Sequence, residues 1–426
     1  MAALLAGCGT ADSASDVSSG ESTGTTDQGF RALVLDAPDG EVSLRLKAEC
    51  EPPATTGYTS PYGIPLEGHE LTASLREDGR FVIEESYIEE WTDGDEAHVV
   101  VEVDGKVEVD GTANGVLRAG LRVWNGQNAA FDMECVTGDV DWSAVPADMS
   151  RLGRDVAVPG VIGVEPAGTG VVAFIADGRP VVIGPDGAGE PVGEPFSDAE
   201  EMGFADYVGA LAVVDGAVWS HGRPDPQGAG IVRTDLATGA QVSVAKHVLA
   251  FAYDSGELFA LTLVEEQVRL ERMDPVTGAT LASVPAEGGR LAVDDARLWV
   301  VPQVGPGVFG YDRETLDLTS EHPIGEPALD VVIGPGGLWL LREDTISFLD
   351  TTSGVESVMN IGGVGSLVAD ERGAWVSQPQ ERVLRRVEGG EIVDVVDLPE
   401  GASDLEPTND GSLWASLKDR VLEVRP

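Results

Sequence analysis

The chain has 426 residues, and its 74 acidic against 27 basic side chains give a formal net charge of −47. A field of this sign repels nucleic acid and anionic lipid, so we exclude both as direct partners. The acids are spread along the chain and form no tail, which favours a solvated surface, for example in salt adaptation, over cation binding or attraction of a basic partner. No run of 18 apolar residues occurs, so the sequence predicts no membrane-spanning helix.

Positions 5–8 read Leu-Ala-Gly-Cys, a tetrapeptide that resembles the lipobox of bacterial lipoproteins. The resemblance implies cleavage before Cys8 and attachment of lipid to Cys8. Residues 9–29 are mainly Gly, Thr, Ser, Ala, Asp and Glu, and such a segment buries too little apolar surface to offset its ordering entropy. We therefore interpret residues 1–29 as a signal remnant and flexible tether of an extracytoplasmic protein, anchored to the outer face of the cell membrane. The alternative is an unstructured tail whose cysteine has no role.

Residues 30–142 carry short runs typical of β-strands. In residues 42–47, for example, Val and Leu alternate with Ser, Arg and Lys. Alternation with one polar face indicates half-buried antiparallel strands. A region of this length and pattern favours an antiparallel β-sandwich.

The chain contains three cysteines. If Cys8 carries lipid, Cys50 and Cys135 remain within one β domain, and in an oxidising compartment we expect them to form a disulfide. That disulfide would close a loop of 85 residues (135 − 50), for which the chain-entropy estimate of stabilisation is about 4 kcal/mol. The alternative is a pair of buried free thiols.

An aromatic residue recurs at a nearly fixed interval in the remaining two thirds of the chain. The recurring residues are Trp219, Phe259, Trp299, Trp339, Trp375 and Trp414, with successive differences of 40, 40, 40, 36 and 39. Each interval contains short apolar runs separated by turns such as Asp215-Gly216. A repeat of this length with four short strands indicates the blades of a β-propeller, in which the aromatic side chains pack between the sheets.

The last repeat ends after only three expected strands. A closed ring leaves no free sheet edge, so we expect residues 155–158 to supply the missing strand. Residues 143–155, which include Pro146, read as a linker, and residues 156–426 as the propeller domain. Seven blades fit the repeat best, with six or eight as alternatives.

Two sequence segments of this repeat resemble those of a known group of proteins. Gly336-Gly-Leu-Trp339 and Arg272-Met-Asp-Pro-Val-Thr-Gly278 resemble the repeats of YVTN/virginiamycin-B-lyase-like propellers. The resemblance implies a propeller fold in a group that includes lyases, surface-layer proteins and binding proteins. Lyase members hold a magnesium ion with a His and acidic residues near the channel, and no His of this chain matches that motif.

Polar residues occur in the loops that we expect between the second and third strands of each blade. These loops gather on one face of a propeller, where side chains from several blades can form a pocket. The candidate ligand-binding residues are His221, Arg223, Asp225, Glu265, Glu266, Arg342, Glu343, Asp344, Glu381, Arg382, Asp419 and Arg420. The sequence shows no metal-spaced Cys/His cluster, no nucleophile elbow and no phosphate loop, so it assigns no catalytic residue and no cofactor.

The sequence therefore predicts a lipid-anchored, monomeric, all-β binding protein. Its ligand on the propeller face is a protein, a glycan or a small molecule, and its only link to the membrane is the lipid. One alternative is a lyase or hydrolase that uses Ca²⁺ or Mg²⁺ at the channel mouth. Another is a scaffold for an envelope complex. Fold alone does not decide among these.

Overall fold

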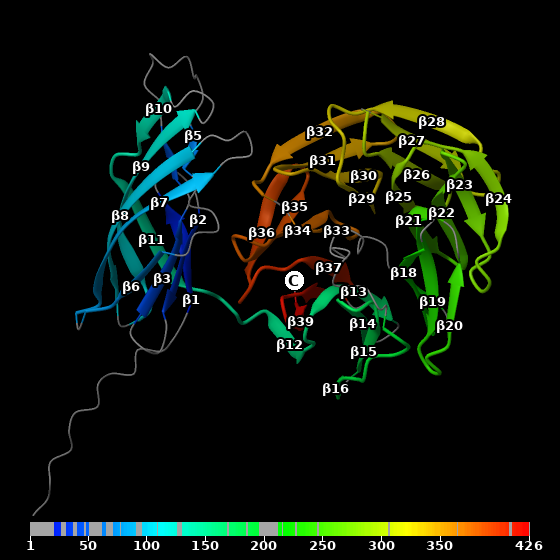
Figure 1. The fold of residues 1–426 in the computed structure, drawn as a ribbon, viewed down its shortest axis with the longest axis horizontal. Coiled ribbons are helices and arrows are strands. Elements are labelled where there is room, and N and C mark those ends of the chain that lie inside the picture. The colour runs from blue at the N-terminus through cyan, green and yellow to red at the C-terminus, as the bar shows by residue number, and fades with distance from the viewer. Residues whose placement is uncertain are drawn as a thin grey trace, which may run out of the picture. The chain divides into compact units, whose positions relative to one another are not determined.

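The structure is a computed structural model. It describes residues 21–26, 31–36, 41–46, 48–50, 62–64, 71–76, 78–90, 96–108, 110–125, 130–167, 170–184, 186–195, 212–214, 216–225, 228–244, 247–305, 307–363, 365–408 and 411–425. Within these residues the chain forms strands and turns without a helix, as predicted for an all-β protein (Figure 1). Accordingly, no helix there is long and apolar enough to cross a membrane. The chain divides into two compact units, Met1–Asp148 and Met149–Pro426.

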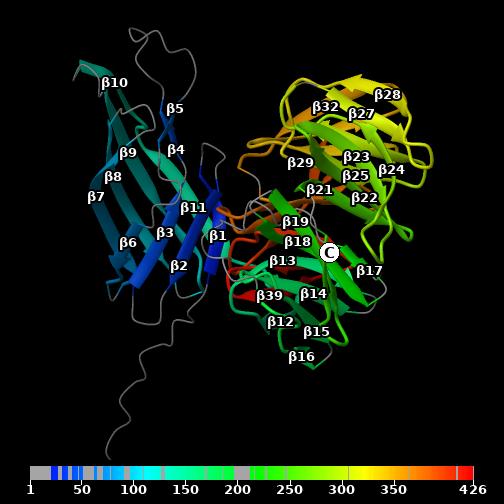
Figure 2. The ribbon, with the colours of Figure 1, turned by 45° about the vertical axis from the view of Figure 1, so that its right-hand side comes forward.

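The first unit is built almost entirely from one antiparallel sheet. Its strands are β1 (Glu21–Thr26), β2 (Arg31–Asp36), β3 (Glu41–Leu46), β4 (Ala48–Cys50), β5 (Tyr62–Ile64), β6 (Leu71–Ser74), β7 (Arg80–Glu90), β8 (Glu96–Val107), β9 (Ala113–Asn125), β10 (Ala130–Val136) and β11 (Val140–Pro146). Nine of them form a sheet in the order β6-β3-β2-β1-β11-β9-β8-β7, with β10 on β9, and β4 pairs only with β5. The strands at the two ends of this order, β6 and β7, lie in contact (Figure 2). Because the hydrogen bonds join one large sheet and not two, the predicted β-sandwich is not confirmed.

One face of this sheet carries the core of the first unit. Along β8, the buried residues Ala97, Val99, Val101 and Val103 alternate with more exposed ones. They pack with Phe81 and other buried residues from neighbouring strands. The period of two that the sequence shows therefore selects the face that is removed from water.

Strand β1 lies inside the segment that the sequence predicts to be a tether. Residues Glu21–Thr26 pair antiparallel with β11 on one side and with β2 on the other. Such pairing gives a polar segment hydrogen-bond partners that its composition does not reveal. The tether prediction is therefore wrong for these residues, and residues 1–20 lie outside the described part of the chain.

The second unit contains seven four-stranded antiparallel sheets in its described residues. Three of them consist of β13 (Val161–Ala167), β14 (Gly170–Ile175), β15 (Pro180–Gly184) and β16 (Gly187–Ala188); β17 (Ala212–Val214), β18 (Ala217–Asp225), β19 (Gly228–Asp235) and β20 (Gln241–Val244); and β21 (His247–Asp254), β22 (Glu257–Val264), β23 (Gln267–Met273) and β24 (Thr280–Pro285). Three more consist of β25 (Gly289–Val293), β26 (Arg297–Pro302), β27 (Gly307–Asp312) and β28 (Leu318–Pro323); β29 (Asp330–Gly334), β30 (Gly337–Leu341), β31 (Thr345–Asp350) and β32 (Val355–Asn360); and β33 (Leu367–Ala369), β34 (Ala374–Gln378), β35 (Val383–Glu388) and β36 (Glu391–Asp397). The seventh joins β12 (Leu152–Ala157) to β39 (Arg420–Val424), β38 (Leu413–Ser416) and β37 (Asp404–Pro407).

These sheets are the blades of a β-propeller. The first strands of neighbouring sheets touch around the ring: β25 contacts β21 and β29, β33 contacts β29 and β37, and β13 contacts β37 and β17. Figure 1 shows β13, β21, β25, β29, β33 and β37 on the inner side of the ring. The first strand of each blade therefore borders the central channel.

The ring closes by pairing the two ends of the propeller segment. β12 pairs with β39, with Val156 opposite Val421 and Ala157 opposite Arg420. The expected closing strand around residues 155–158 is thereby confirmed, although it begins earlier, at Leu152. The unit boundary after Asp148 falls inside the predicted linker.

The recurring aromatic side chains are buried, as the repeat predicts. Trp219, Trp299 and Trp375 are at most 1% exposed. The turns between third and fourth strands repeat as well: the Asp274 carboxylate accepts hydrogen bonds from the amides of Val276 and Thr277 at 2.9 and 2.7 Å. These hydrogen bonds lower the pKa of Asp274. Gly278 then closes the turn at φ +69°, where a side chain would be strained.

Candidate functional site

Of the twelve residues predicted to bind a ligand, eight lie between second and third strands, and five of the twelve make contacts internal to the propeller. His221, Arg223 and Asp225 belong to β18, which runs further than expected, and their side chains lie outside the described part. Glu265 and Glu266 form the β22–β23 turn at positive φ and are exposed. The two propeller cavities described below are not lined by these residues.

Residues of the β38–β39 and β34–β35 turns hold neighbouring segments together. The Asp419 carboxylate accepts a hydrogen bond from the Gly160 amide at 3.1 Å, and Arg420 forms ion pairs with Asp155 and Glu400. Glu381 pairs with Arg385 at 2.7 Å, and Arg382 donates to the carbonyl of Pro399 at 3.1 Å. Each contact is internal to the propeller, so these side chains stabilise the fold.

Arg342 is the clearest example of an internal role. Its guanidinium lies 2.6 Å from Glu356 and 2.6 Å from the Ser347 hydroxyl, with side-chain exposures of 7% for Arg342 and 11% for Glu356. Burial alone would raise the pKa of Glu356, but hydrogen bonds from Ser347, Gly325 and Arg342 outweigh it and lower the pKa. Glu343 and Asp344, the next two residues, are exposed.

A different set of polar residues lines the central channel. Glu165 comes from β13, Asp330 from β29, and Asp404 and Glu406 from β37, all of them first strands of blades. The four carboxyl groups border one cavity of about 290 Å³, together with residues of β25 and β33. First strands place them there because the pleat turns alternate side chains of an inner strand toward the channel.

Two of these carboxyl groups have protein partners. Asp404 accepts hydrogen bonds from the Val164 amide at 3.0 Å and from the Ser366 hydroxyl at 3.3 Å. Asp330 accepts one from the Val331 amide at 2.9 Å. The carboxyl groups of Glu165 and Glu406 receive neither a hydrogen bond nor an ion pair from the described residues, although both side chains are largely surrounded by protein.

The channel environment holds protons on these acids. Burial, followed by the charge of Asp404, raises the pKa of Glu165 to about 8, and burial raises the pKa of Asp404 to about 6. Burial and the charges of Glu165, Asp404 and Asp330 raise the pKa of Glu406 well above its ordinary value. Near neutral pH the four carboxyl groups are therefore partly protonated, and the charge of Arg290 favours the ionised form of Asp330 only in part.

The arrangement suits a cationic group of an organic ligand. No group of three or more His, Cys, Asp or Glu within the described residues has the geometry to hold a metal ion. An ammonium or guanidinium group needs only hydrogen-bond acceptors and negative charge, which the carboxyl groups of Glu165 and Glu406 supply once they release their protons, without giving up an existing partner.

The sequence did contain a signal for two of these acids. Glu165-Pro166 and Glu406-Pro407 repeat the same dipeptide in the first strands of adjoining blades. Asp330 and Asp404, at the start of their strands, have no such mark. Their approach to the channel depends on how first strands from different blades lie next to one another, which a local sequence pattern does not describe.

Comparison with known protein families and with curated proteins finds no match. Among solved structures, the chain is similar to BBS1N in complex with ARL6DN, with a TM-score of 0.51 and 12% identity over 65% of this chain and 96% of that one. It is also similar to hydrazine synthase from Kuenenia stuttgartiensis, with a TM-score of 0.50 and 11% identity over 63% of this chain and 96% of that one. At these identities the likeness supports the propeller fold alone.

Proposed function

We propose that this protein is a non-catalytic binding protein whose propeller channel takes up an amine or guanidinium group. The observation that carries the proposal is the pair Glu165 and Glu406, which share a cavity and lack a cationic partner among the described residues. Proteins rarely bury such acids unpaired, and a bound cation would offset both their desolvation and their mutual repulsion. The ligand is a free amine or the basic side chain of a peptide.

Calorimetric titration of the full chain with 1,4-diaminobutane, at pH 8 and pH 5.5, tests the proposal. We expect saturable binding at pH 8 that is about tenfold weaker at pH 5.5, because protonated carboxyl groups no longer attract the ammonium. Butanol is the neutral control, and an Arg-containing tripeptide separates free amines from basic peptides.

Variants locate the site. Glu165→Gln combined with Glu406→Gln should abolish amine binding, whereas Glu265→Gln combined with Glu266→Gln, on the exposed β22–β23 turn, should leave it unchanged. Binding that survives in the channel variant, or the absence of saturable binding by diaminobutane at low salt, would refute the proposal.

The lipid anchor and the disulfide are the second part of this proposal. Cys8 lies outside the described residues, as does the Cys50 side chain, while Cys135 is only 4% exposed. Support for anchoring comes from the Leu5–Cys8 tetrapeptide and the polar stretch after it. We propose that lipid on Cys8 holds the protein at the outer face of the membrane, and that Cys50 and Cys135 are joined.

Intact-mass measurement of protein from membranes of the producing bacterium tests both statements. We expect a chain that starts at Cys8 and carries acyl groups, and a gain of two hydrogens on reduction. Cys8→Ser should release the protein from the membrane fraction. An unmodified Cys8 in membrane-extracted protein contradicts the anchor, and two alkylatable thiols without reductant contradict the disulfide.

A further inference from the structure

A contact between neighbouring blades recurs at the same place around the ring. The buried aromatic residue of one blade meets the turn between third and fourth strands of the next blade. At the first such seam, the Trp219 indole donates to the carbonyl of Pro275 at 3.0 Å. At the second, Arg313 lies 5.7 Å from the centre of the Phe259 ring. Pro275 and Arg313 occupy equivalent positions in their blades. Phe259 pairs with Arg272, and Pro275 lies three residues after Arg272. Trp299 pairs with Gly310, and Arg313 lies three residues after Gly310.

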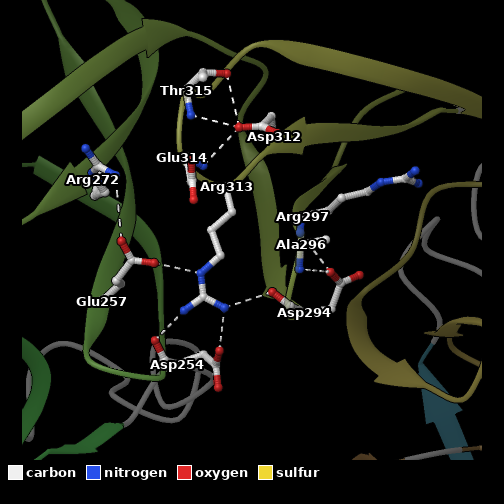
Figure 3. A network of polar contacts seen from close by, with 10 residues as sticks. All are labelled: Asp254, Glu257, Arg272, Asp294, Ala296, Arg297, Asp312, Arg313, Glu314 and Thr315. Carbon is white, nitrogen blue, oxygen red and sulfur yellow. Dashed lines mark hydrogen bonds and ion pairs between the residues drawn. The ribbon is translucent and has the colours of Figure 1, made fainter.

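Arg313 shows how a charged side chain fills this place at one seam (Figure 3). Its guanidinium reaches back to the preceding blade, 2.6 Å from the Asp254 carboxylate and 2.8 Å from that of Glu257. It also donates to the main-chain carbonyls of Asp254 and Asp294 at 2.7 and 2.9 Å. Asp254 and Glu257 face each other across the β21–β22 turn.

The seam between the blades β29–β32 and β33–β36 lacks all of these side chains. The register places Gly389 at the position of Arg313, because Trp375 pairs with Arg386 as Trp299 pairs with Gly310. Gly334 and Gly337, which pair across the β29–β30 turn, stand at the positions of Asp254 and Glu257. Three glycines thus replace one arginine and its two carboxylates.

A cavity of about 370 Å³ lies at this seam, with Gly389 in its lining, and we call it the seam pocket. Trp339 and Phe348, with ring centres 5.1 Å apart, line it together with apolar residues from both blades. The apolar residues are Ile346, Val358, Met359 and Val387. Its size lies at the small end of the range of ~300–1,000 Å³ that is typical of ligand sites.

Two polar groups at the seam pocket have no side-chain partner within the described residues, one of them buried and one exposed. The Trp339 indole nitrogen is buried without a hydrogen-bond acceptor, whereas the Trp299 indole donates to the Asp294 carboxylate at 2.8 Å. Gly334 stands where Asp294 would be. Arg372 is exposed and lines the pocket, and its guanidinium has no ion-pair partner within the described residues. A lone cation beside an apolar cavity is notable in a chain of net charge −47.

We propose that the seam pocket binds a small organic anion, namely a carboxylate on an apolar body. The body packs against Trp339 and Phe348, where burial of apolar surface supplies the affinity. The carboxylate pairs with Arg372, whose planar guanidinium suits two parallel hydrogen bonds. The seam pocket shares no lining residue with the channel cavity, and its proposed ligand does not depend on amine binding there.

Titration of the full chain with 3-phenylpropionate, and with 3-phenylpropanol as the neutral match, tests the site. We expect saturable binding of the carboxylate that is about tenfold tighter than that of the alcohol. Arg372→Gln should reduce carboxylate affinity to that of the alcohol. Arg80→Gln, an exposed arginine of the first unit, should change neither.

Two further variants act on the cavity itself. Ser357 lines the pocket and is exposed, so Ser357→Trp should fill it and abolish binding of both probes with little change in melting temperature. Val358→Asp places a negative charge at the same wall and should weaken the carboxylate more than the alcohol. Unchanged binding in both variants overturns the assignment. So does the absence of saturable binding of 3-phenylpropionate, hexanoate and indole-3-acetate at millimolar concentrations.

Discussion

Replacement of Arg342 by alanine is expected to lower the free energy of unfolding by about 3–5 kcal/mol, because removing one partner of a buried ion pair leaves the other partner's charge buried and unpaired. The sequence suggests a ligand-binding role for Arg342, but the structure shows its guanidinium enclosed by Glu356, Ser347 and the main-chain carbonyl of Glu326. Without Arg342, Glu356 stays buried with an uncompensated charge. Urea denaturation of the two proteins measures the difference.

Companion variants separate the ion pair from simple loss of packing. Arg342→Lys keeps the charge but loses the planar fork that meets Glu356 and Ser347 together, so most of the loss should remain. Arg342→Met combined with Glu356→Leu removes both charges and should recover most of the stability. Arg372→Ala, at an exposed arginine, should change stability by no more than about 0.5 kcal/mol. A loss below about 1 kcal/mol for Arg342→Ala would show that the pair does not stabilise the blade.

The melting temperature of the protein is expected to fall as the pH rises from 5 to 8.5, and Glu165→Gln is expected to flatten that fall. The ordinary pKa of a glutamate is 4.5, and burial in the channel raises the pKa of Glu165 to about 8. Between these values the native state holds a proton that the unfolded chain has released. Stability therefore decreases with pH across this window, by an amount on the order of a few kcal/mol.

Several charged groups contribute to this dependence together with Glu165. Asp404, Glu406 and Asp330 face the same cavity, and Arg290 acts on Asp330 in the opposite direction. Glutamine at position 165 stays neutral at every pH, so its variant should be more stable than the natural protein at pH 8 and nearly equal to it at pH 5. The exposed variant Glu265→Gln should keep the natural slope. A melting temperature that is constant or rises with pH, in 0.2 M salt, would contradict the burial of these acids.

The amino-acid sequence by itself determined the repeated architecture of the second unit. The aromatic period marked the second strand in six of the seven sheets, because a large flat side chain packs well between radially arranged sheets. The incomplete last repeat indicated that residues near 155 must close the ring, and β12 does so on β39. Alternation within residues 42–47 likewise identified a buried face of the first unit, where Val42 and Leu44 are fully buried.

The tertiary structure decided which polar side chains have a partner. Arg342 and Glu265 both follow second strands and look alike in the sequence, yet one is buried against Glu356 and the other is exposed. Glu165 and Glu406 are 241 residues apart (406 − 165) and share a cavity only because the ring closes between β37 and β13. The alternation of apolar and polar residues along a strand shows which of its side chains are buried. It does not show which residues of other blades lie next to a polar side chain, because those residues are far apart in the sequence.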